Sequence, residues 1–231
     1  MSSILTDKHA IAAALEAGQI SRLICCRGKQ GDSKLIQMAK TAGVKIKTVV
    51  QPAFEREYGS YALVGIQRMI PHHAFKSLDI RADTQILIAD HIQDPHNMGA
   101  LIRSAVSFGY TAFIYAKDRQ CPITESVIRA SAEATAHINI YAVPNIATTV
   151  NRLKQQGCWV YGATLDGQPI QHWRPVKPYA LVVGHEHNGL SSVVTKLLDT
   201  GIAINTPGKT ASLNVSVAGG IIMHWAQLNA G

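Results

Sequence analysis

Residues 86–104 read Ile-Leu-Ile-Ala-Asp-His-Ile-Gln-Asp-Pro-His-Asn-Met-Gly-Ala-Leu-Ile-Arg-Ser, a short apolar run, a polar turn and then a helical pattern. The run at 86–89 has the length of a buried strand, and residues 98–107 carry apolar side chains at helical spacing. Asp94 or Asn97 is suited to cap that helix. The stretch therefore predicts a strand that leads directly into a helix, the repeating unit of α/β folds.

The same alternation continues to the end of the chain. Further apolar strands are expected at 112–115, 138–142, 159–163, 179–184 and 201–204. Helical patterns are expected at 123–135, 146–156, 191–198 and 215–228. Continuous apolar strands that alternate with helices predict an α/β fold with a mainly parallel sheet and helices on both faces.

The segment before residue 85 has the pattern of a smaller α/β unit. Helices are expected from about residue 10, after Thr6-Asp7, to Gly18 and again at 34–41, with strands at 22–26, 45–50 and 61–66. Residues 76–84 are polar and lack periodicity, which is typical of a linker. We therefore predict a small α/β domain at 1–75, a linker at 76–84 and a main domain at 85–231.

The composition indicates a globular protein with a polyanionic partner. Of 231 residues, 47% are hydrophobic and 16% are charged, and the net charge is +7. Residues 1–84 hold 12 Lys or Arg against 7 Asp or Glu, which favours a nucleic acid as the partner, although a solvated basic face is the alternative. No apolar run approaches the roughly 20 residues of a membrane span, and no secretory signal precedes the first helix, so we expect a cytoplasmic protein without a membrane contact.

Metal and disulfide chemistry are not expected. Cys25, Cys26, Cys121 and Cys158 have no zinc-site spacing, and they are interpreted as reduced, partly buried thiols. The closest histidine groupings, His72-His73 and His185 with His187, lack the helical spacing with a Glu that zinc enzymes use.

Two later segments carry further polar groups. Gly184-His185-Glu186-His187-Asn188-Gly189 follows an apolar strand and precedes a helix, although a plain strand-to-helix turn would explain it as well. Ser212-Leu213-Asn214-Val215-Ser216 leads into the last helix, where Ser212 or Asn214 is a natural cap. In open α/β folds such positions build the ligand site.

Several common chemistries are disfavoured by missing motifs. The chain has no Gly-x-Gly spacing, no P-loop lysine motif and no Gly-x-Ser-x-Gly turn. Hydride transfer with a dinucleotide, NTP hydrolysis and serine hydrolysis are therefore not expected.

In this order, the segments 97–103, 184–189 and 212–216 resemble the three motifs of the SpoU (TrmH) family of RNA 2′-O-ribose methyltransferases. The resemblance covers residues 85–231. Asp94-Pro95-His96-Asn97, Lys117-Asp118-Arg119 and residues 212–218 are most similar to the branch that methylates a guanosine in 23S ribosomal RNA. The first 75 residues resemble the small ribosomal-protein-like RNA-binding domain of that branch.

The resemblance implies a fold, a cofactor and an assembly. It implies that the C-terminal loops form a deep trefoil knot of the SPOUT type, that backbone of the knotted loops holds S-adenosyl-L-methionine, and that two copies form a homodimer. Carried over residue by residue, cofactor binding falls on Gly184, Ile204, Ser212 and Leu213. Catalytic or site-organising roles fall on Asn97, Arg103, Glu186, Ser212 and Asn214. Contacts to RNA fall on Arg103, Lys117 and Arg119.

The chain departs from the family pattern at three positions. Asn205 follows Ile204 where the family usually has proline, and Glu133 and Ala136 replace a glycine and an acidic residue. We expect local differences in loop geometry there.

Methyl transfer to a ribose hydroxyl requires oxygen, carbon and sulfur to be held in line, and the hydroxyl proton must leave. Arg103 has been assigned the role of base in this family, but a guanidinium resists deprotonation. Our hypothesis is that Arg103 binds the adjacent phosphate and stabilises a developing alkoxide, while phosphate or solvent receives the proton. Asn97 would position Arg103 or the ribose, and Glu186 would orient Arg103 by an ion pair.

Two classes of function remain open at this point. The first is an RNA 2′-O-methyltransferase that acts on a ribosomal RNA loop or, as the alternative, on tRNA. The second is a noncatalytic RNA-binding assembly factor with the same fold. The presence of Arg103, Glu186 and Asn214 favours the first.

Overall fold

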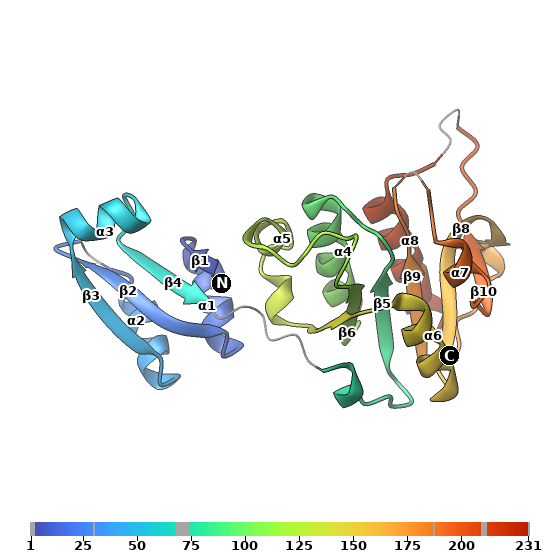
Figure 1. Cartoon of the computed structure of the whole chain (residues 1–231), viewed down its shortest axis with the longest axis horizontal. Helices are drawn as coiled ribbons and strands as arrows, with labels where there is room; N and C mark the ends of the chain where they lie inside the picture. The colour runs from blue at the N-terminus through green and yellow to red at the C-terminus, as the bar shows by residue number, and fades with distance from the viewer. Residues whose placement is uncertain (1–2, 30, 68–73, 187, 209–211, 231) are drawn as a thin grey trace.

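The computed structural model describes residues 3–29, 31–67, 74–186, 188–208 and 212–230. These residues form two units, each built around its own sheet, and Figure 1 shows them beside each other along the long axis. The four strands of one sheet all precede residue 68, and the six strands of the other all follow residue 84. This grouping is compatible with domains at 1–75 and 85–231, but those boundaries and the linker at 76–84 stay predictions.

The N-terminal unit is a four-stranded sheet of order β1-β4-β2-β3. Its strands are β1 (Ser3–Leu5), β2 (Ile20–Arg27), β3 (Lys45–Val50) and β4 (Leu63–Gln67). Its helices are α1 (Lys8–Glu16), α2 (Ser33–Thr41) and α3 (Gln51–Tyr58). The carboxylates of Asp7 and Asp32 cap α1 and α2, each accepting from two backbone N–H groups, which explains where these helices begin.

The C-terminal unit is a six-stranded sheet of order β10-β8-β9-β5-β6-β7 in which every pair is parallel. Its strands are β5 (Gln85–Ala89), β6 (Ala112–Ala116), β7 (Asn139–Val143), β8 (Trp159–Pro169), β9 (Tyr179–Val183) and β10 (Thr200–Ala203). Its helices are α4 (Pro95–Ser107), α5 (Glu125–Ala130), α6 (Ile146–Gln155), α7 (Ser192–Thr195) and α8 (Val215–Asn229). Three short 3₁₀ helices are η1 (Phe75–Ser77), η2 (Ala134–Ala136) and η3 (Ile170–His172). The predicted α/β class and the mainly parallel sheet are confirmed.

Alternating side chains of the central strand belong to two different cores. Leu87 and Ala89 of β5 pack with α4, α5 and α8, whereas Ile86 and Ile88 pack with α6 and α7. All four side chains are fully buried. Because successive residues of a strand point to opposite faces, this alternation shows that helices cover the sheet on both sides.

Three elements differ clearly from their predicted extents. The helix expected at 191–198 is limited to α7, Ser192–Thr195. β8 was expected to end at residue 163 but continues to Pro169, where Gln168 and Pro169 pair with Ile202 and Ala203 of β10 after a register shift. The predicted helix at 123–135 divides into α5 and η2 because the backbone takes left-handed values at Ala132 and Glu133, with φ of 46° and 66°. A helix cannot continue through such residues.

The order of helices and strands does not by itself show whether the C-terminal loops are knotted, so the trefoil knot stays a prediction. No helix within the described ranges is long and apolar enough to cross a membrane.

Candidate functional site

The carboxyl ends of β5 and β9 lie next to each other in the middle of the C-terminal sheet. The chain leaves β5 through α4 on one face of the sheet, and it leaves β9 through α7 on the other face. The connections therefore diverge between these two neighbouring strands. In open α/β sheets, a crevice at such a switch point is where ligands bind.

Three side chains from distant segments form a hydrogen-bonded row beside this crevice. Asn97, in the first turn of α4, donates from Nδ2 to Oε1 of Glu186 across 3.0 Å. Asn214, directly before α8, donates from Nδ2 to Oδ1 of Asn97, also across 3.0 Å. We call the side chains of Glu186, Asn97 and Asn214 the amide bridge. It contains one residue from each of the three segments that the sequence singled out.

The orientation of both amides in the bridge is determined by their partners. Oδ1 of Asn214 accepts from the backbone N–H groups of Ser216 and Val217 at 2.9 and 3.4 Å. A backbone N–H can donate only to the oxygen of an amide side chain and not to its NH₂ group. Nδ2 of Asn214 must then face Asn97, which presents its own oxygen. The Nδ2 group of Asn97 is thereby directed to the carboxylate of Glu186. The carboxylate and the helix terminus thus hold the bridge in one arrangement.

Helix capping explains part of these observations but not all of them. Asp94 caps α4 through its bond from the N–H of His96, so Asn97 is not the cap and is free for the bridge. Asn214 does cap α8, as expected for a residue at that place. It uses only its oxygen for this purpose, and its NH₂ group contributes to the site.

Close backbone contacts bring the segments together. A Cβ atom on Gly184 would lie 2.4 Å from the carbonyl carbon of Gly189, because the loop after β9 folds back on its first residue. A Cβ atom on Gly99 would lie 2.5 Å from that of Ala130, where α5 crosses α4. Both glycines are therefore required by packing.

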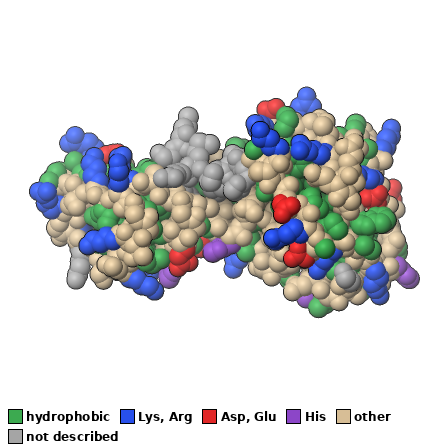
Figure 2. Space-filling model, turned by 90° about the horizontal axis from the view of Figure 1, so that it is seen from below, with side chains coloured by type: hydrophobic (Ala, Val, Ile, Leu, Met, Phe, Trp, Pro, Cys, Tyr) green, Lys and Arg blue, Asp and Glu red, His purple; other side chains and the backbone are tan. Residues whose placement is uncertain are grey.

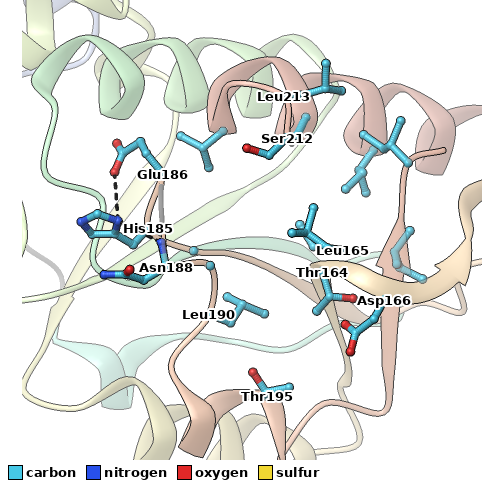
Figure 3. A pocket seen from close by; sticks show the side chains of 18 of the residues that line it. Thr164, Leu165, Asp166, His185, Glu186, Asn188, Leu190, Thr195, Ser212 and Leu213 are labelled. Atoms are coloured by element: carbon cyan, nitrogen blue, oxygen red, sulfur yellow. Dashed lines mark hydrogen bonds and ion pairs between the residues drawn. The ribbon is translucent and has the colours of Figure 1, made fainter. Parts of the chain in front are cut away.

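A cavity of about 440 Å³ opens beside Glu186. Its wall is formed by the end of β8, the loop after β9, the end of β10 and the first turns of α8. Figure 3 shows Glu186 and His185 on one side of it and Thr164, Leu165 and Asp166 on the other. The volume lies within the range of about 300–1,000 Å³ for pockets that bind small molecules and cofactors.

All four residues assigned to cofactor binding line this cavity: Gly184, Ile204, Ser212 and Leu213. Apolar side chains of Leu165, Leu190 and Ile222 share the wall with polar groups. The hydroxyl of Thr164 is buried and has no hydrogen-bond partner among the described residues. Such a wall fits a molecule with an apolar or aromatic part and polar ends, and a donor–acceptor group near Thr164 would satisfy that hydroxyl.

The contribution of β8 was missed by sequence reasoning. Thr164, Leu165 and Asp166 follow the apolar run at 159–163 and carry no motif. A signal was available, since Gly162 and Gly167 bracket them and a Cβ atom on Gly167 would lie 2.4 Å from the carbonyl carbon of Gly201. Paired glycines near the end of a strand often indicate such a close approach.

The structure does not bring Arg103 to the amide bridge. Its side chain is exposed on α4, and Glu186 is instead within 3.9 Å of Nδ1 of His185. Within the described residues of one chain, no ion pair joins Arg103 to Glu186, so that predicted contact is absent. Lys117 and Arg119 are likewise exposed on the loop after β6 and lie outside the cavity.

Two of the three departures from the family pattern, Glu133 and Ala136, follow the end of α5. Glu133 has the left-handed backbone that glycine adopts most readily, which explains why the family usually has glycine there. Burial raises the pKa of the Glu133 carboxyl, as does the nearby charge of Asp7, while His9 and Arg103 act in the opposite direction. The Glu133 carboxyl is therefore influenced by charges of the N-terminal unit and of α4. Ala136 lies in η2, and Asn205 is exposed after β10.

The described thiols and histidines provide no candidate metal centre. All four cysteines are free, and burial raises the pKa of Cys158 to about 12. In the described part of the chain, no three His, Cys, Asp or Glu side chains cluster in a way that could hold a metal ion. His72, His73 and His187 lie outside the described residues, so the expected absence of a metal stays a prediction.

Comparisons with known proteins show what the sequence and the fold of this chain are similar to. Residues 84–224 match the sequence model of the SpoU rRNA Methylase family. The 23S rRNA (guanosine-2′-O-)-methyltransferase RlmB of Xylella fastidiosa strain 9a5c is 32% identical, with 96% of this chain and 90% of that protein covered. An uncharacterised tRNA/rRNA methyltransferase of Synechocystis sp. is also 32% identical over 96% of this chain, which spans 61% of that protein. The crystal structure of the SpoU methyltransferase AviRb from Streptomyces viridochromogenes in complex with AdoMet superposes with a TM-score of 0.84 at 20% identity, covering 98% of this chain and 90% of that one.

Proposed function

The chain belongs to the SpoU rRNA methylase family, and from this premise we propose that it transfers a methyl group from S-adenosyl-L-methionine to a ribose 2′-hydroxyl of RNA. The proposed substrate is a guanosine of 23S ribosomal RNA, which the name of the Xylella relative supports, with tRNA as the second candidate. The observation that carries the proposal is the amide bridge, because it joins all three family segments beside a cofactor-sized cavity.

The cavity is the proposed cofactor site. Gly184 lets the loop after β9 fold back so that its backbone forms one wall, and Ile204 and Leu213 supply apolar surface on the others. S-adenosyl-L-methionine supplies a methyl group activated by its positive sulfonium. The carboxylate of Glu186, on the wall of the cavity, is placed to attract a cationic group. We also propose that the C-terminal loops around this cavity form a trefoil knot.

The amide bridge is the proposed orienting device for the ribose. Both NH₂ groups are directed along the row toward Glu186, so the bridge cannot rotate without breaking a hydrogen bond. Preorganised groups of this kind contribute to catalysis because they need no rearrangement during the reaction. Ser212, exposed at the cavity, is a further candidate for a hydrogen bond to the substrate. Arg103 is proposed to bind the phosphate beside the target ribose.

We propose that the chain forms a homodimer and that Arg103 of one copy supplies its guanidinium to the site of the other copy. Arg103 of the same chain makes no ion pair with Glu186, although α4 packs against α8. Val217 and Ile221, one turn apart on α8, are 50% and 41% exposed and form an apolar surface. If two copies pair through this surface, Arg103 of one copy can face the amide bridge of the other.

The N-terminal unit is the proposed RNA reader. On the face of the molecule that Figure 2 shows, the surface of this unit carries more Lys and Arg than Asp and Glu side chains. Its exposed basic residues include Lys8, Arg22, Arg27, Lys34, Lys40, Lys45, Lys47 and Arg56. Phosphate contacts of this type give an affinity that falls as salt rises. We propose that the protein is located in the cytoplasm, where ribosomal RNA is assembled into ribosomes.

Two measurements test the proposal. Calorimetry should detect binding of S-adenosyl-L-methionine to the purified protein, whereas a noncatalytic assembly factor would show none. Mapping of ribose methylation in total RNA from cells with and without the protein should then reveal one site that depends on it. If the cofactor binds but no ribose methylation is lost, the proposed reaction is wrong.

A further inference from the structure

His91, directly after β5, has a conformation that costs energy. Its φ is 67°, in the left-handed region that glycine enters freely and other residues enter rarely. Such backbone strain costs on the order of 1–3 kcal/mol and concentrates at functional sites. The conformation by itself does not show what the residue does, but it directs attention to the contacts of its side chain.

A buried carboxylate fixes the ring of His91. Nδ1 of His91 donates to Oδ1 of Asp90 across 2.7 Å, and the Asp90 side chain is only 1% exposed. The other oxygen of Asp90 accepts from the N–H of Ser191 at 2.9 Å, which ties the carboxylate to the segment that precedes α7. Because Nδ1 is engaged, Nε2 is the ring nitrogen left for a ligand, and the His91 side chain is 36% exposed.

The loop after β6 is joined to the same place. The N–H of His91 donates to Oε1 of Gln120 across 2.7 Å, and the N–H of Cys121 donates to the carbonyl of Ile92 across 2.8 Å. These bonds hold residues 120 and 121 beside His91, while the N–H of Lys117, at the start of the same loop, donates to the carbonyl of Val143 at the end of β7. Arg119 also has a left-handed backbone, with φ of 57°.

The charges of this loop are available to a ligand. Lys117 and Arg119 are exposed, and no ion pair engages either of them in the part of the chain that the structure describes. Asp118, between them, is the exposed counter-charge, and Asp90 is the buried one. Two exposed cations therefore lie on the loop whose residues 120 and 121 bond to the backbone of His91 and Ile92, at the carboxyl edge of the sheet and close to the switch point between β5 and β9.

We propose that His91, Arg119 and Lys117 form a binding site for the RNA phosphates that flank the target nucleotide. The inference rests on the proposed function, and it adds a residue that no motif of the chain assigns. Nε2 of the imidazolium form donates to one phosphate oxygen, and the two flexible cations contact the same or the next phosphate. The competing explanation is that His91 only covers Asp90, in which case its ring contributes to folding and not to RNA binding.

Two substitutions at His91 separate these explanations. Asn tolerates the left-handed backbone and can still donate to Asp90, so H91N keeps the fold but loses Nε2. H91G removes the strain and the ring together. H137N is the control. His137 is exposed and precedes the amino end of β7, whereas His91 follows the carboxyl end of β5. R119Q tests the charge of the loop.

The experiment measures equilibrium binding of each full-length variant to an unmodified transcript of 23S ribosomal RNA over a range of salt concentrations. We expect H91N and H91G to bind about 3- to 10-fold more weakly, since an exposed charge-assisted contact is worth less than a buried one. R119Q should lower the slope of log affinity against log salt by roughly 0.7–0.9, the value for one phosphate contact. H137N should bind like the unmodified protein.

Unchanged RNA affinity in H91N and H91G would overturn the proposal and leave only the role of covering Asp90. A salt slope in R119Q equal to that of the unmodified protein would remove Arg119 from the site. These results are distinguishable from failure of the proposed function. If the proposed function is wrong, the protein without any substitution will neither bind S-adenosyl-L-methionine nor methylate ribose.

Discussion

The side-chain amide of Asn97 donates to the carboxylate of Glu186 across 3.0 Å, although the two residues are 89 positions apart in the sequence. Asn97 is therefore fixed between the loop after β9 and the cap of α8, where Asn214 donates to its oxygen. A hydrogen bond to a charged group contributes about 1.5–3 kcal/mol, more than a neutral one. This contact links the three segments and supports most of the predictions below.

Asn214→Asp should separate helix capping from the function of the site. Aspartate caps a helix about as well as asparagine, so the free energy of unfolding should change by less than about 1 kcal/mol. The substitution replaces the NH₂ donor by an oxygen that faces the oxygen of Asn97, and the methyl-transfer rate should fall at least about tenfold because the bridge breaks. Urea unfolding and single-turnover transfer check the two parts. Full methyl-transfer activity in Asn214→Asp would mean that Asn214 acts only as a cap.

Asn97→Ala should lower the transfer rate constant by roughly 10- to 100-fold, the effect of losing about 1.5–3 kcal/mol of orientation. Binding of S-adenosyl-L-methionine should change little, since Asn97 does not line the cavity. Asn145→Ala is the matched control, because Asn145 caps α6 on the other face of the sheet. It should lose stability without loss of activity. Equal loss of activity in both variants would contradict the account.

Gly184→Ala should abolish cofactor binding. The added methyl group would lie 2.4 Å from the backbone of Gly189, so the loop that forms one wall of the cavity would have to move. Gly208→Ala is the control, because nothing lies within 4 Å of an added Cβ there and its φ is not positive. Calorimetry with S-adenosyl-L-methionine checks both variants. Normal affinity in Gly184→Ala would mean that this loop does not hold the cofactor.

Arg103→Lys should lower the transfer rate at least about tenfold, because lysine lacks the planar fork that holds a phosphate at two points. Near-normal turnover would refute the need for the guanidinium. Mixing inactive Arg103→Ala with inactive Asn214→Asp should restore part of the activity if the site combines residues of two copies. Absence of any recovery in mixed dimers would show that Arg103 acts within its own chain or not at all.

Stability should decline in alkali as buried tyrosines are forced to ionise. Burial raises the pKa of Tyr179 and of Tyr115 to about 12, whereas an unfolded tyrosine has a pKa of about 10. The neutral form is favoured in the folded state, so the stabilisation is complete below pH 10 and is lost as the pH rises toward 12. Urea unfolding at a series of pH values measures this decline. A free energy of unfolding that stays constant from about pH 9 to 11.5 would contradict it.

The sequence predicted the C-terminal sheet well because its strands are apolar runs bounded by polar turns. Residues 86–89 and 179–183 are buried on both faces of the sheet. Such short, continuous apolar runs are typical of central strands in a parallel sheet. β1, with three residues, was not expected because it is defined by its antiparallel pairing with β4. α3 was not expected either, since it begins after Val50 without a side-chain cap, although Pro52 in its first turn is compatible with a helix start.

The site was predicted in its residues but not in its contacts. The three motif segments indicated Asn97, Glu186 and Asn214, and the structure joins them in a row. The partner of Glu186 was predicted to be Arg103, because charge pairing is readable from a sequence whereas the direction of a helix face is not. Asn97 and Arg103 are six residues apart on α4, which places them on different faces of the helix.

Transfer of a labelled methyl group from S-adenosyl-L-methionine to 23S ribosomal RNA, followed by digestion to nucleosides, tests the central claim most directly. The account predicts label on a ribose 2′-oxygen of guanosine with the unmodified protein and at least about tenfold less with Asn214→Asp at equal cofactor occupancy. Label on a base, or equal ribose methylation by both proteins, would contradict it.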